Sequence, residues 1–393
     1  MVYVQRCLSD CGFLRVNFAL LTGYRMSGSK VLTMQQPLLP EIPVVDVRVG
    51  GTLRQAQEGA ARARALRDDC LTFFPSAIAF VLPALDRLAR RWLSRSRSPY
   101  ITEIEGIAAA LGFSGVWFLN GSYQWGCTAM ARDEEGEPWL ARVLDWPFPG
   151  LGRHVEIAHT WSASGDFYNV TWPGYVGTLT GMAPGRFGAS INQAPLWRRT
   201  RHPWLRPFDI AANALSTWRI RHIPPDQLLR QVFETCPDFA TAREKLERTP
   251  VARPVIFTLA GTKAGERCVI ERTEEDFETR STLTCAANDW FERRDPWEAR
   301  IGGDIVLSCS YDDAAANSRA RREAIAGYEG ALSGSPFGWL TEPVHNRYTR
   351  LAVEMCPARG IIRVMGFDEA PEKALAVPVT QIREVVAPIT AAA

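Results

Sequence analysis

A cysteine follows a glycine directly in the stretch Asn120-Gly-Ser-Tyr-Gln-Trp-Gly-Cys127-Thr-Ala-Met-Ala131, where the residue pattern changes from helical to strand-like. Glycine carries no Cβ, so nothing on Gly126 hinders attack on its carbonyl carbon. The Cys127 thiol can take the Gly126 acyl group from its own nitrogen, and water can hydrolyse the resulting thioester. We expect this reaction to cut the backbone between Gly126 and Cys127 and to leave a free α-amine beside the thiol.

The new amine would give the cysteine a general base of its own. An unperturbed α-amino group has a pKa of roughly 7.7–8.0, so near neutral pH it can accept the thiol proton. The chain has five histidines, at positions 154, 159, 202, 222 and 345, and none stands in a recognisable Cys/His motif. A single cysteine is most often a buried core residue, so this interpretation depends on the residues downstream.

The composition is that of a globular protein with a large core, since 46% of the 393 residues are hydrophobic and 22% are charged. Lysine and arginine number 45 against 43 acidic residues, which argues against a general affinity for nucleic acid. The nine cysteines form no CxxC motif and no Cys/His cluster of zinc spacing, so we expect no metal ion and no cofactor.

The cellular location is predicted from the same residues. An odd number of widely spaced cysteines suits a reducing compartment. The apolar patch near the N-terminus is interrupted by Arg15 and Asn17, which makes it a weak signal peptide. We therefore expect a cytoplasmic protein, with export left open.

Periodicity divides the chain into helical and strand-like regions. Apolar residues recur at helical spacing through residues 50–115, and again near 205–222, 225–235, 238–247 and 316–332. Alternating, aromatic-rich runs after Cys127 predict strands at 139–146, 154–161, 166–172, 187–192, 255–260, 268–272, 277–285 and 361–367. This order predicts an α+β fold with two stacked sheets covered by helices. We divide the chain into an N-terminal extension (1–40), a helical segment before the cut (41–126) and a catalytic part (127–393).

Two charged residues are expected to lie beside the cysteine. The run Trp139-Leu-Ala-Arg142-Val-Leu-Asp145 reads as a second strand, which a hairpin through residues 133–136 would lay alongside the Cys127 strand. A guanidinium favours thiolate over thiol, and a carboxylate can orient the new amine. Arg142 and Asp145 are therefore candidate catalytic residues.

At this point the sequence resembles a known family, the acid ceramidase and N-acylethanolamine amidase branch of the choloylglycine hydrolase-like superfamily. The resemblance runs from about Ile42 to Phe367. It is carried by Glu103-Ile-Glu-Gly-Ile-Ala108, Cys127-Thr128, Arg142, Leu144-Asp145-Trp146, Ala183-Pro-Gly-Arg-Phe187, Ser190-Ile-Asn-Gln193, Phe257-Thr-Leu-Ala-Gly-Thr262, Val269-Ile-Glu-Arg272 and Asn288-Asp289-Trp290. It implies an N-terminal-nucleophile hydrolase with a four-layer αββα sandwich, cut before Cys127 into two chains that stay associated.

The resemblance also assigns roles to single residues. Cys127 would be nucleophile and base, Arg142 and Asp145 would position its amine and the substrate amide, and Asn288 would supply an oxyanion-hole N–H. A later arginine is expected in the run Ser318-Arg-Ala-Arg-Arg-Glu323, where Arg321 fits best beside Arg319 and Arg322.

Asn192 and Gln193 are expected to contact substrate, but the second residue departs from the family pattern. The animal lipid amidases carry an acidic residue where this chain has Gln193, and glutamine cannot titrate, so an acid-activation step that depends on that carboxyl is in doubt here. A second departure is the stretch from Cys127 to Arg142, which is about one residue shorter than in those enzymes; we expect a bulge or a tighter turn to absorb it.

The expected substrate is a linear amide with an apolar acyl group, such as an N-acylethanolamine, a ceramide-like lipid or an N-acyl amino acid. Trp146, Phe148, Trp172 and Tyr175 could line an acyl pocket. The apolar segment 73–82 and its basic continuation to Trp92 resemble helices with which lipid amidases meet acyl chains or membranes; the same segment could also simply cover a sheet. The alternatives are a penicillin- or bile-salt-type acylase or acyltransferase, and an uncleaved, inactive lipid-binding relative.

Overall fold

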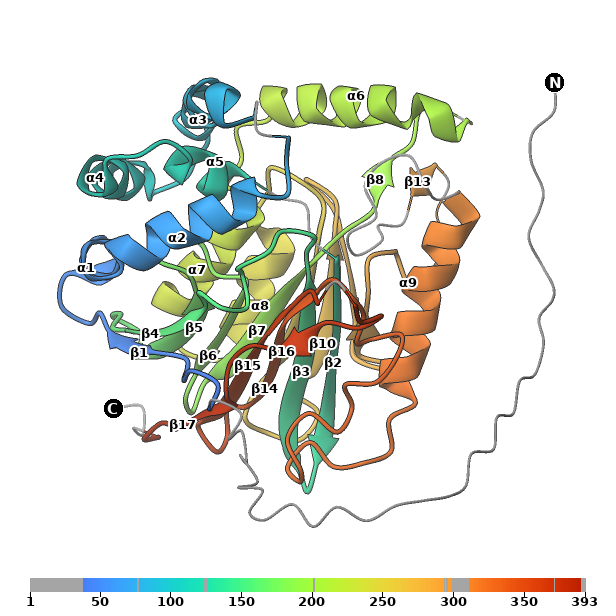
Figure 1. Cartoon of the computed structure of the whole chain (residues 1–393). Helices are drawn as coiled ribbons and strands as arrows, with labels where there is room; N and C mark the ends of the chain where they lie inside the picture. Colours follow the sequence, from blue (N-terminus) through green and yellow to red (C-terminus); the bar gives the residue numbers. More distant parts are fainter. Residues whose placement is uncertain are drawn as a thin grey trace, which may run out of the picture. The chain divides into compact units, whose positions relative to one another are not determined.

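Two β-sheets form the centre of the computed structural model (Figure 1). The structure describes residues 38–75, 78–122, 126–200, 202–292, 294, 296–298, 311–370 and 372–389. The expected N-terminal extension lies outside these residues, apart from its last three. Residues Leu39–Ala393 form one compact unit.

The larger sheet, called sheet A here, is antiparallel except at one edge, where β1 and β4 run parallel. Its strands, in spatial order, are β1 (Val44–Asp46), β4 (Glu156–Thr160), β5 (Phe167–Thr171), β6 (Thr180–Ala183), β7 (Phe187–Gln193), β9 (Val255–Ala260), β10 (Arg267–Arg272) and β11 (Phe277–Arg280). A separate two-stranded ribbon pairs β8 (Leu196–Trp197) with β13 (Trp297–Glu298).

The second sheet, sheet B, carries the candidate cysteine. Its strands, in spatial order, are β12 (Cys285–Ala286), β2 (Gly126–Glu134), β3 (Glu137–Asp145), β14 (Thr349–Cys356), β15 (Ile361–Asp368) and β16 (Val377–Pro378), and β17 (Arg383–Val386) also pairs with β15. The sheets face each other closely: a Cβ at Gly188 of β7 would lie 2.6 Å from the sulfur of Met355 in β14. A larger residue at that position would require the Met355 side chain to shift.

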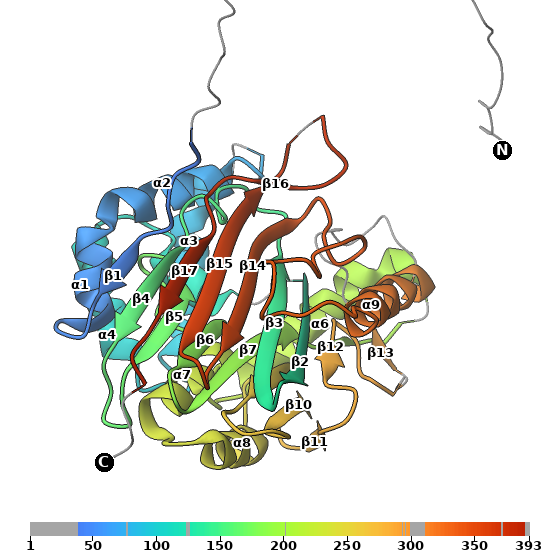
Figure 2. The same cartoon turned by 90° about the horizontal axis from the view of Figure 1, so that it is seen from below.

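Helices pack on sheet A and on one edge of sheet B (Figures 1 and 2). Before the cut come α1 (Gly51–Glu58), α2 (Ala60–Leu71), α3 (Ile78–Leu93), α4 (Ile101–Leu111) and α5 (Val116–Gly121); after it come η1 (Pro203–Leu205), α6 (Arg206–Arg219), α7 (Pro225–Thr235), α8 (Phe239–Arg248) and α9 (Tyr311–Ala326). Phe233 of α7 stacks on Phe187 of sheet A, and α9 packs on β2 and β12 of sheet B. The fold is thus the predicted α+β, four-layer αββα sandwich. No helix within the described residues is long and apolar enough to cross a membrane.

The hairpin of β2 and β3 sets the position of the candidate site. Glu135 and Gly136 have φ angles of 53° and 85°, as a two-residue turn with both central residues left-handed requires. The ladder from Gly126↔Asp145 to Glu134↔Glu137 has no register shift. A tight turn, rather than a bulge, therefore accommodates the short stretch between Cys127 and Arg142.

Several elements differ from the sequence prediction. Periodicity did not predict β14, whose residues are all buried, because a strand buried on both faces shows no alternation. It also missed β6, a four-residue strand that contains Gly181, and β17, so the strand at 361–367 is not the last one. The helix expected at 316–332 begins at Tyr311 and ends at Ala326, directly before Gly327.

Candidate active site

Cys127 is the second residue of β2 and is fully buried between the sheets. Within the antiparallel ladder Gly126 lies opposite Asp145, and Cys127 lies opposite Leu144. The hairpin therefore places the expected cut beside the carboxylate that the sequence had singled out.

The thiol lies against the Arg142 guanidinium. Nη2 of Arg142 donates to Cys127 Sγ at 3.2 Å and to the Ile191 carbonyl oxygen at 2.9 Å. Burial raises the pKa of the Cys127 thiol to about 11, while the positive charges of Arg142 and Arg321 act in the opposite direction. In the uncut chain the sulfur is thus a protonated thiol at neutral pH.

The backbone nitrogen of Cys127 is held by Asn288. This nitrogen donates to Asn288 Oδ1 at 2.8 Å, and Asn288 Nδ2 donates to the Gln193 carbonyl oxygen at 2.8 Å. Nη2 of Arg321 also donates to Oδ1, at 3.0 Å. Because both neighbours of Oδ1 can only donate, they fix the orientation of the amide.

Arg321 binds several groups around the nucleophile. Its Nη1 donates to the Cys127 carbonyl oxygen at 2.7 Å and to Thr128 Oγ1 at 3.0 Å, and lies 3.8 Å from Asp145 Oδ2. Arg319 is exposed, and Arg322 lies against Asp289 and the Trp290 carbonyl. The geometry selects Arg321 from the three arginines that the sequence offered.

Asp145 is fully buried and is held from the neighbouring strand. Its Oδ1 accepts a hydrogen bond from Thr349 Oγ1 at 3.0 Å. The next residue, Trp146, donates its backbone N–H to the Tyr348 carbonyl oxygen at 2.8 Å. β14 therefore fixes both the carboxylate and the start of the loop that follows it.

Asn192 and Gln193 lie at the end of β7, next to the site. Nδ2 of Asn192 donates to the carbonyl oxygens of Ala286 and Ala287 at 3.2 and 3.1 Å, which holds the segment that leads into Asn288. Gln193 contributes its backbone carbonyl, as described above. A direct contact of either side chain with substrate stays a prediction.

An apolar cavity of about 180 Å³ includes Trp146, the residue after Asp145, in its lining, although none of the polar residues described above lines it. Its walls come from helices α2 to α5 before the cut and from the loops after β3 and β5. The lining side chains are nearly all apolar and include Leu66, Phe74, Leu82, Leu85, Leu111, Phe118, Trp146, Phe148, Leu151, Trp172, Tyr175 and Leu179. Trp146 and Trp172 thus line an apolar cavity, and their contact with an acyl group stays a prediction. Phe80, in the middle of the apolar run 73–82, is 89% exposed and points away from the cavity.

Sequence reasoning missed three polar residues that support the site. Thr128 accepts a hydrogen bond from Arg321, and Thr349 donates one to Asp145. Ser318 Oγ accepts from the Asn288 N–H at 2.9 Å and donates to Asp289 at 2.7 Å. Thr128 and Ser318 stood next to residues already singled out. Thr349 begins the strand that periodicity did not reveal, so no local pattern pointed to it.

The chain resembles curated proteins over part of its length. It is 30% identical over 181 residues to an N-acylethanolamine-hydrolyzing acid amidase of Cavia porcellus, a match that covers 44% of this chain and 48% of that protein. It is 30% identical over 232 residues to an acid ceramidase of Mus musculus, covering 52% and 55%. The chain thus spans about half the length of the curated relatives it matches. No family model matches the chain.

A solved structure is also similar. An N-acylethanolamine-hydrolyzing acid amidase ortholog of Caenorhabditis elegans superimposes with a TM-score of 0.44 at 17% identity, covering 59% of this chain and 93% of that one. The names of the relatives agree with the family that the motifs around Cys127 resemble. Over about half of its length the chain is therefore similar to acid ceramidases and N-acylethanolamine-hydrolyzing acid amidases, the family that its motifs resemble.

Proposed function

We propose that this chain is an amide hydrolase with an N-terminal cysteine nucleophile, which it generates by cutting its own backbone before Cys127. One observation carries the proposal: three buried side chains hold three different atoms of Cys127. Arg142 contacts the sulfur, Asn288 accepts from the nitrogen and Arg321 donates to the carbonyl oxygen. A core cysteine that served only packing would need no guanidinium at its sulfur, and its backbone N–H and carbonyl would ordinarily pair with a neighbouring strand rather than with two buried polar side chains.

The first reaction would be self-cleavage. Sγ of Cys127 attacks the Gly126 carbonyl carbon, the bond to the Cys127 nitrogen breaks, and that nitrogen keeps the proton released by the thiol. Water then hydrolyses the thioester, which leaves a carboxyl group on Gly126 and a free thiol and amine on Cys127. Asp145 lies opposite Gly126 in the ladder, where its carboxylate can stabilise the nitrogen as it becomes an amine.

Turnover would repeat the same chemistry on a substrate. The α-amine accepts the thiol proton, sulfur attacks the substrate carbonyl, and the leaving amine takes that proton away. Water, deprotonated by the α-amine, hydrolyses the acyl-enzyme to a free carboxylic acid. Asn288 Oδ1 already holds the nitrogen that acts as base, and its Nδ2 is the candidate donor to the oxyanion.

The cavity supports an apolar acyl group on the substrate. Trp146 belongs to its wall and directly follows Asp145, which connects the cavity lining to the strand that pairs with the Cys127 strand. The relatives are named for hydrolysing N-acylethanolamines and ceramide. We therefore assign linear fatty-acyl amides to this chain; penicillin- or bile-salt-type amides are the alternative.

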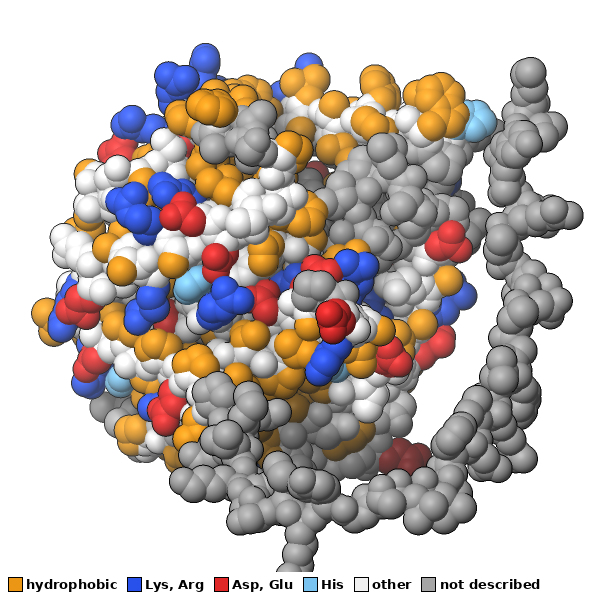
Figure 3. Space-filling view, in the orientation of Figure 1, with side chains coloured by type: hydrophobic (Ala, Val, Ile, Leu, Met, Phe, Trp, Pro, Cys, Tyr) orange, Lys and Arg blue, Asp and Glu red, His pale blue; other side chains and the backbone are white. Residues whose placement is uncertain are grey.

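Two helices offer a surface for peripheral membrane contact. Phe80, Val81 and Leu88 of α3 are exposed, as are Trp204, Phe208 and Leu215 of η1 and α6. Figure 3 shows hydrophobic side chains gathered over α3 and α6. Arg87, Arg90 and Arg91 are exposed on α3, so the surface combines apolar and positive groups as anionic lipid requires.

Ion pairs across the cut would keep the two chains together. Arg62 of α2 binds the buried Glu156 of β4, and Glu103 of α4 lies 3.0 Å from Arg230 of α7. Asn120 of α5 accepts from the Val176 N–H at 2.8 Å. These contacts, with the shared apolar core, support association after cleavage.

The test is the specificity constant over a series of N-acyl amides from short to long chains. Each methylene moved from water into the cavity should contribute up to about 0.8 kcal/mol, roughly fourfold per carbon until the cavity is full. A flat profile, or a preference for bulky ring-bearing acyl groups, rejects the lipid amidase in favour of the penicillin- or bile-salt-type enzyme. Absence of all amide hydrolysis would favour the inactive lipid-binding relative.

A further inference from the structure

A chain of ion pairs lies below the loop that forms one wall of the cavity; it is buried at Arg350 and Asp368 and partly exposed at Arg153 and Asp69. The loop, residues 146–154, directly follows Asp145 and contributes Trp146, Phe148 and Leu151 to the cavity lining. Pro147 and Pro149 have no backbone N–H, and two glycines interrupt the loop, so regular strand pairing cannot hold it in place. Another set of contacts must therefore fix this wall.

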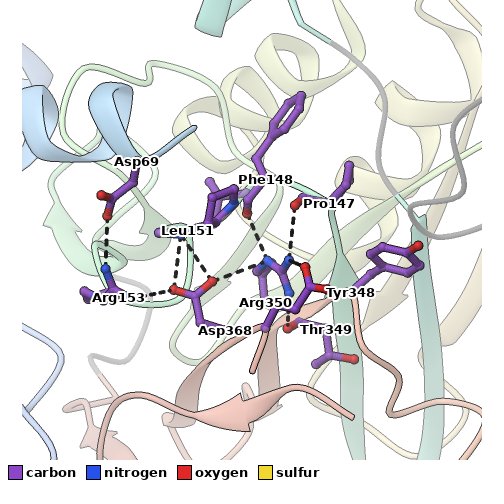
Figure 4. Close-up of polar contacts among 12 residues, drawn as sticks. Asp69, Pro147, Phe148, Leu151, Arg153, Tyr348, Thr349, Arg350 and Asp368 are labelled. Carbon is purple, nitrogen blue, oxygen red and sulfur yellow. Dashed lines mark hydrogen bonds and ion pairs between the residues drawn. The ribbon is translucent and has the colours of Figure 1, made fainter. Parts of the chain in front are cut away.

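Arg350 supplies the first of these contacts. It is fully buried, and its guanidinium donates to the carbonyl oxygens of Phe148 at 2.9 Å and Pro147 at 3.2 Å (Figure 4). The pairing of β14 with β3 shifts register between Thr349 and Leu351, so Arg350 is the extra residue of a β-bulge. The bulge lets Thr349 bind Asp145 while its neighbour Arg350 binds the cavity loop.

Asp368 extends the contact from Arg350 to the far side of the loop. Its Oδ1 lies 3.6 Å from Arg350 Nε, and its two carboxylate oxygens accept from the Gly150 N–H at 3.2 and 3.1 Å. Nη2 of Arg153 lies 3.3 Å from Asp368 Oδ2. Figure 4 shows these side chains converging beneath the loop. The carboxylate thereby balances the buried Arg350 charge and binds the loop at two points.

Asp69 connects this network to helix α2, which lies on the other side of the cut. Its Oδ2 lies 3.2 Å from Arg153 Nη1 and 2.9 Å from His154 Nε2. Gly150 has a φ of 87°, and a Cβ there would lie 2.6 Å from the Asp69 Cβ. The loop and α2 are thus in close contact, and the same helix contributes Leu66 and Leu71 to the lining of the cavity.

We propose that the network Arg350–Asp368–Arg153–Asp69, here called the loop clamp, fixes the distance between the two cavity walls and makes Arg350 and Asp69 positioning residues for acyl-chain selectivity. The inference rests on the proposed function. Arg350 orients the loop from the strand next to the nucleophile, and Asp69 holds the loop against α2. Selectivity therefore depends on residues from both sides of the cut, none of which belongs to the nucleophile's own contacts.

The experiment compares Asp69→Asn and Arg350→Lys with wild type. Asp69→Asn keeps the shape of the side chain but removes its charge, and Arg350→Lys keeps the charge but loses the planar fork that reaches two carbonyls. The ratio of kcat/KM for a long-chain to a short-chain N-acyl amide should fall about fivefold in Asp69→Asn and more in Arg350→Lys. Glu58→Gln, which removes the charge from an exposed ion pair on α1, should leave the ratio unchanged.

A binding measurement separates this inference from the proposed function. Each variant is combined with Cys127→Ala, and its affinity for a fluorescent long-chain fatty acid is measured without turnover. Weaker binding of the fatty acid in both clamp variants supports the inference, even if the wild-type protein hydrolyses no amide. Absence of hydrolysis would contradict only the proposed function. Unchanged affinity, no probe binding by the parent, or an equal loss of activity on long and short substrates overturns the inference.

Discussion

The guanidinium of Arg321 donates a hydrogen bond to the carbonyl oxygen of Cys127 at 2.7 Å, although the two residues are 194 positions apart. The same guanidinium reaches Thr128 and Asn288 and lies 3.8 Å from Asp145. It is fully buried, so these acceptors, together with Asn317 Oδ1 at 3.0 Å from Nε, must replace the water that its charge has lost. Helix α9 is thereby anchored on the strand that begins at the expected cut.

Substituting lysine for this arginine tests the anchor. Lysine keeps the charge but has no planar fork, so it cannot serve acceptors on Cys127, Asn288 and Asp145 together. We expect Arg321→Lys to slow self-cleavage at least about tenfold, on the order of 1.4 kcal/mol or more. Arg322→Lys is the matched control, because Arg322 binds Asp289 and Trp290 instead. The rate at which the cut fragment appears measures self-cleavage in both variants. Equal rates in the two variants would show that Arg321 has no specific role in self-cleavage.

Asn288 has two functions in this account, and one substitution removes both. Asn288→Ala deletes the acceptor for the Cys127 nitrogen and the candidate oxyanion donor, so turnover of a small amide should fall about 10²-fold or more. KM should change much less, because the substrate ground state gains little from either contact. Asn192→Ala, a neighbouring amide that binds only backbone carbonyls among the described residues, should cost less turnover. Unchanged kcat in Asn288→Ala would contradict the assignment.

A pH-dependent contribution to stability is predicted for Asp226. Burial raises its pKa from the ordinary 3.8 to about 6, even though the Tyr175 hydroxyl donates to Oδ2 at 2.8 Å. Because the folded pKa is raised, the contribution is fully present below the unfolded pKa and is lost as pH rises through about 6. The difference between the folded and unfolded pKa values corresponds to roughly 3 kcal/mol of unfolding free energy at most.

Chemical denaturation of Asp226→Asn and wild type between pH 4 and 7 measures this effect. Wild type should gain stability relative to the variant as pH falls through that window. Asp238→Asn is the control: the Asp238 carboxylate caps α8 through the Thr241 N–H, which lowers its pKa, so its contribution is lost only as pH falls below about 4 and should stay nearly constant across this window. If the difference in unfolding free energy between wild type and Asp226→Asn does not change between pH 4 and 7, Asp226 stays ionised in the folded protein.

Because α3 has one face on the cavity and one exposed face, we expect substitutions on the two faces to affect acyl binding and membrane binding separately. Leu85 lines the cavity and Phe80 is exposed, so an aspartate at each position should affect different properties. Leu85→Asp should flatten the dependence of kcat/KM on acyl length. Phe80→Asp should reduce sedimentation with anionic vesicles but leave hydrolysis of a soluble short-chain amide near wild type. If Phe80→Asp alters chain-length preference as Leu85→Asp does, the described orientation of α3 is wrong.

The sequence predicted the centre of the site better than its surroundings. Cys127, Arg142 and Asp145 could be placed together because one hairpin joins them, and a hairpin is a local structure. Asn288 and Arg321 required the family resemblance, since periodicity says nothing about which distant segments meet. The structure then distinguished Arg321 from its neighbours through burial, a property that three arginines in four positions cannot reveal.

The loop clamp shows what could not be predicted. Arg350 contacts the cavity loop because a bulge in β14 directs its side chain there. That strand carries no alternating pattern, so neither the strand nor the bulge could be predicted from the sequence. Phe80 illustrates the opposite case, an apolar residue within a clearly apolar run that faces outward. Hydrophobic runs predict a helix, but the partners of each helix face depend on the tertiary fold.

Intact-mass measurement of the purified protein tests the central claim most directly. The account predicts that wild type separates under denaturing conditions into two fragments, the larger beginning at Cys127, and that Cys127→Ala remains one chain. Cys70→Ala, which changes another cysteine near the cavity, should cleave like wild type. A wild-type protein that hydrolyses amides while its mass shows a single uncut chain would contradict the proposed N-terminal nucleophile.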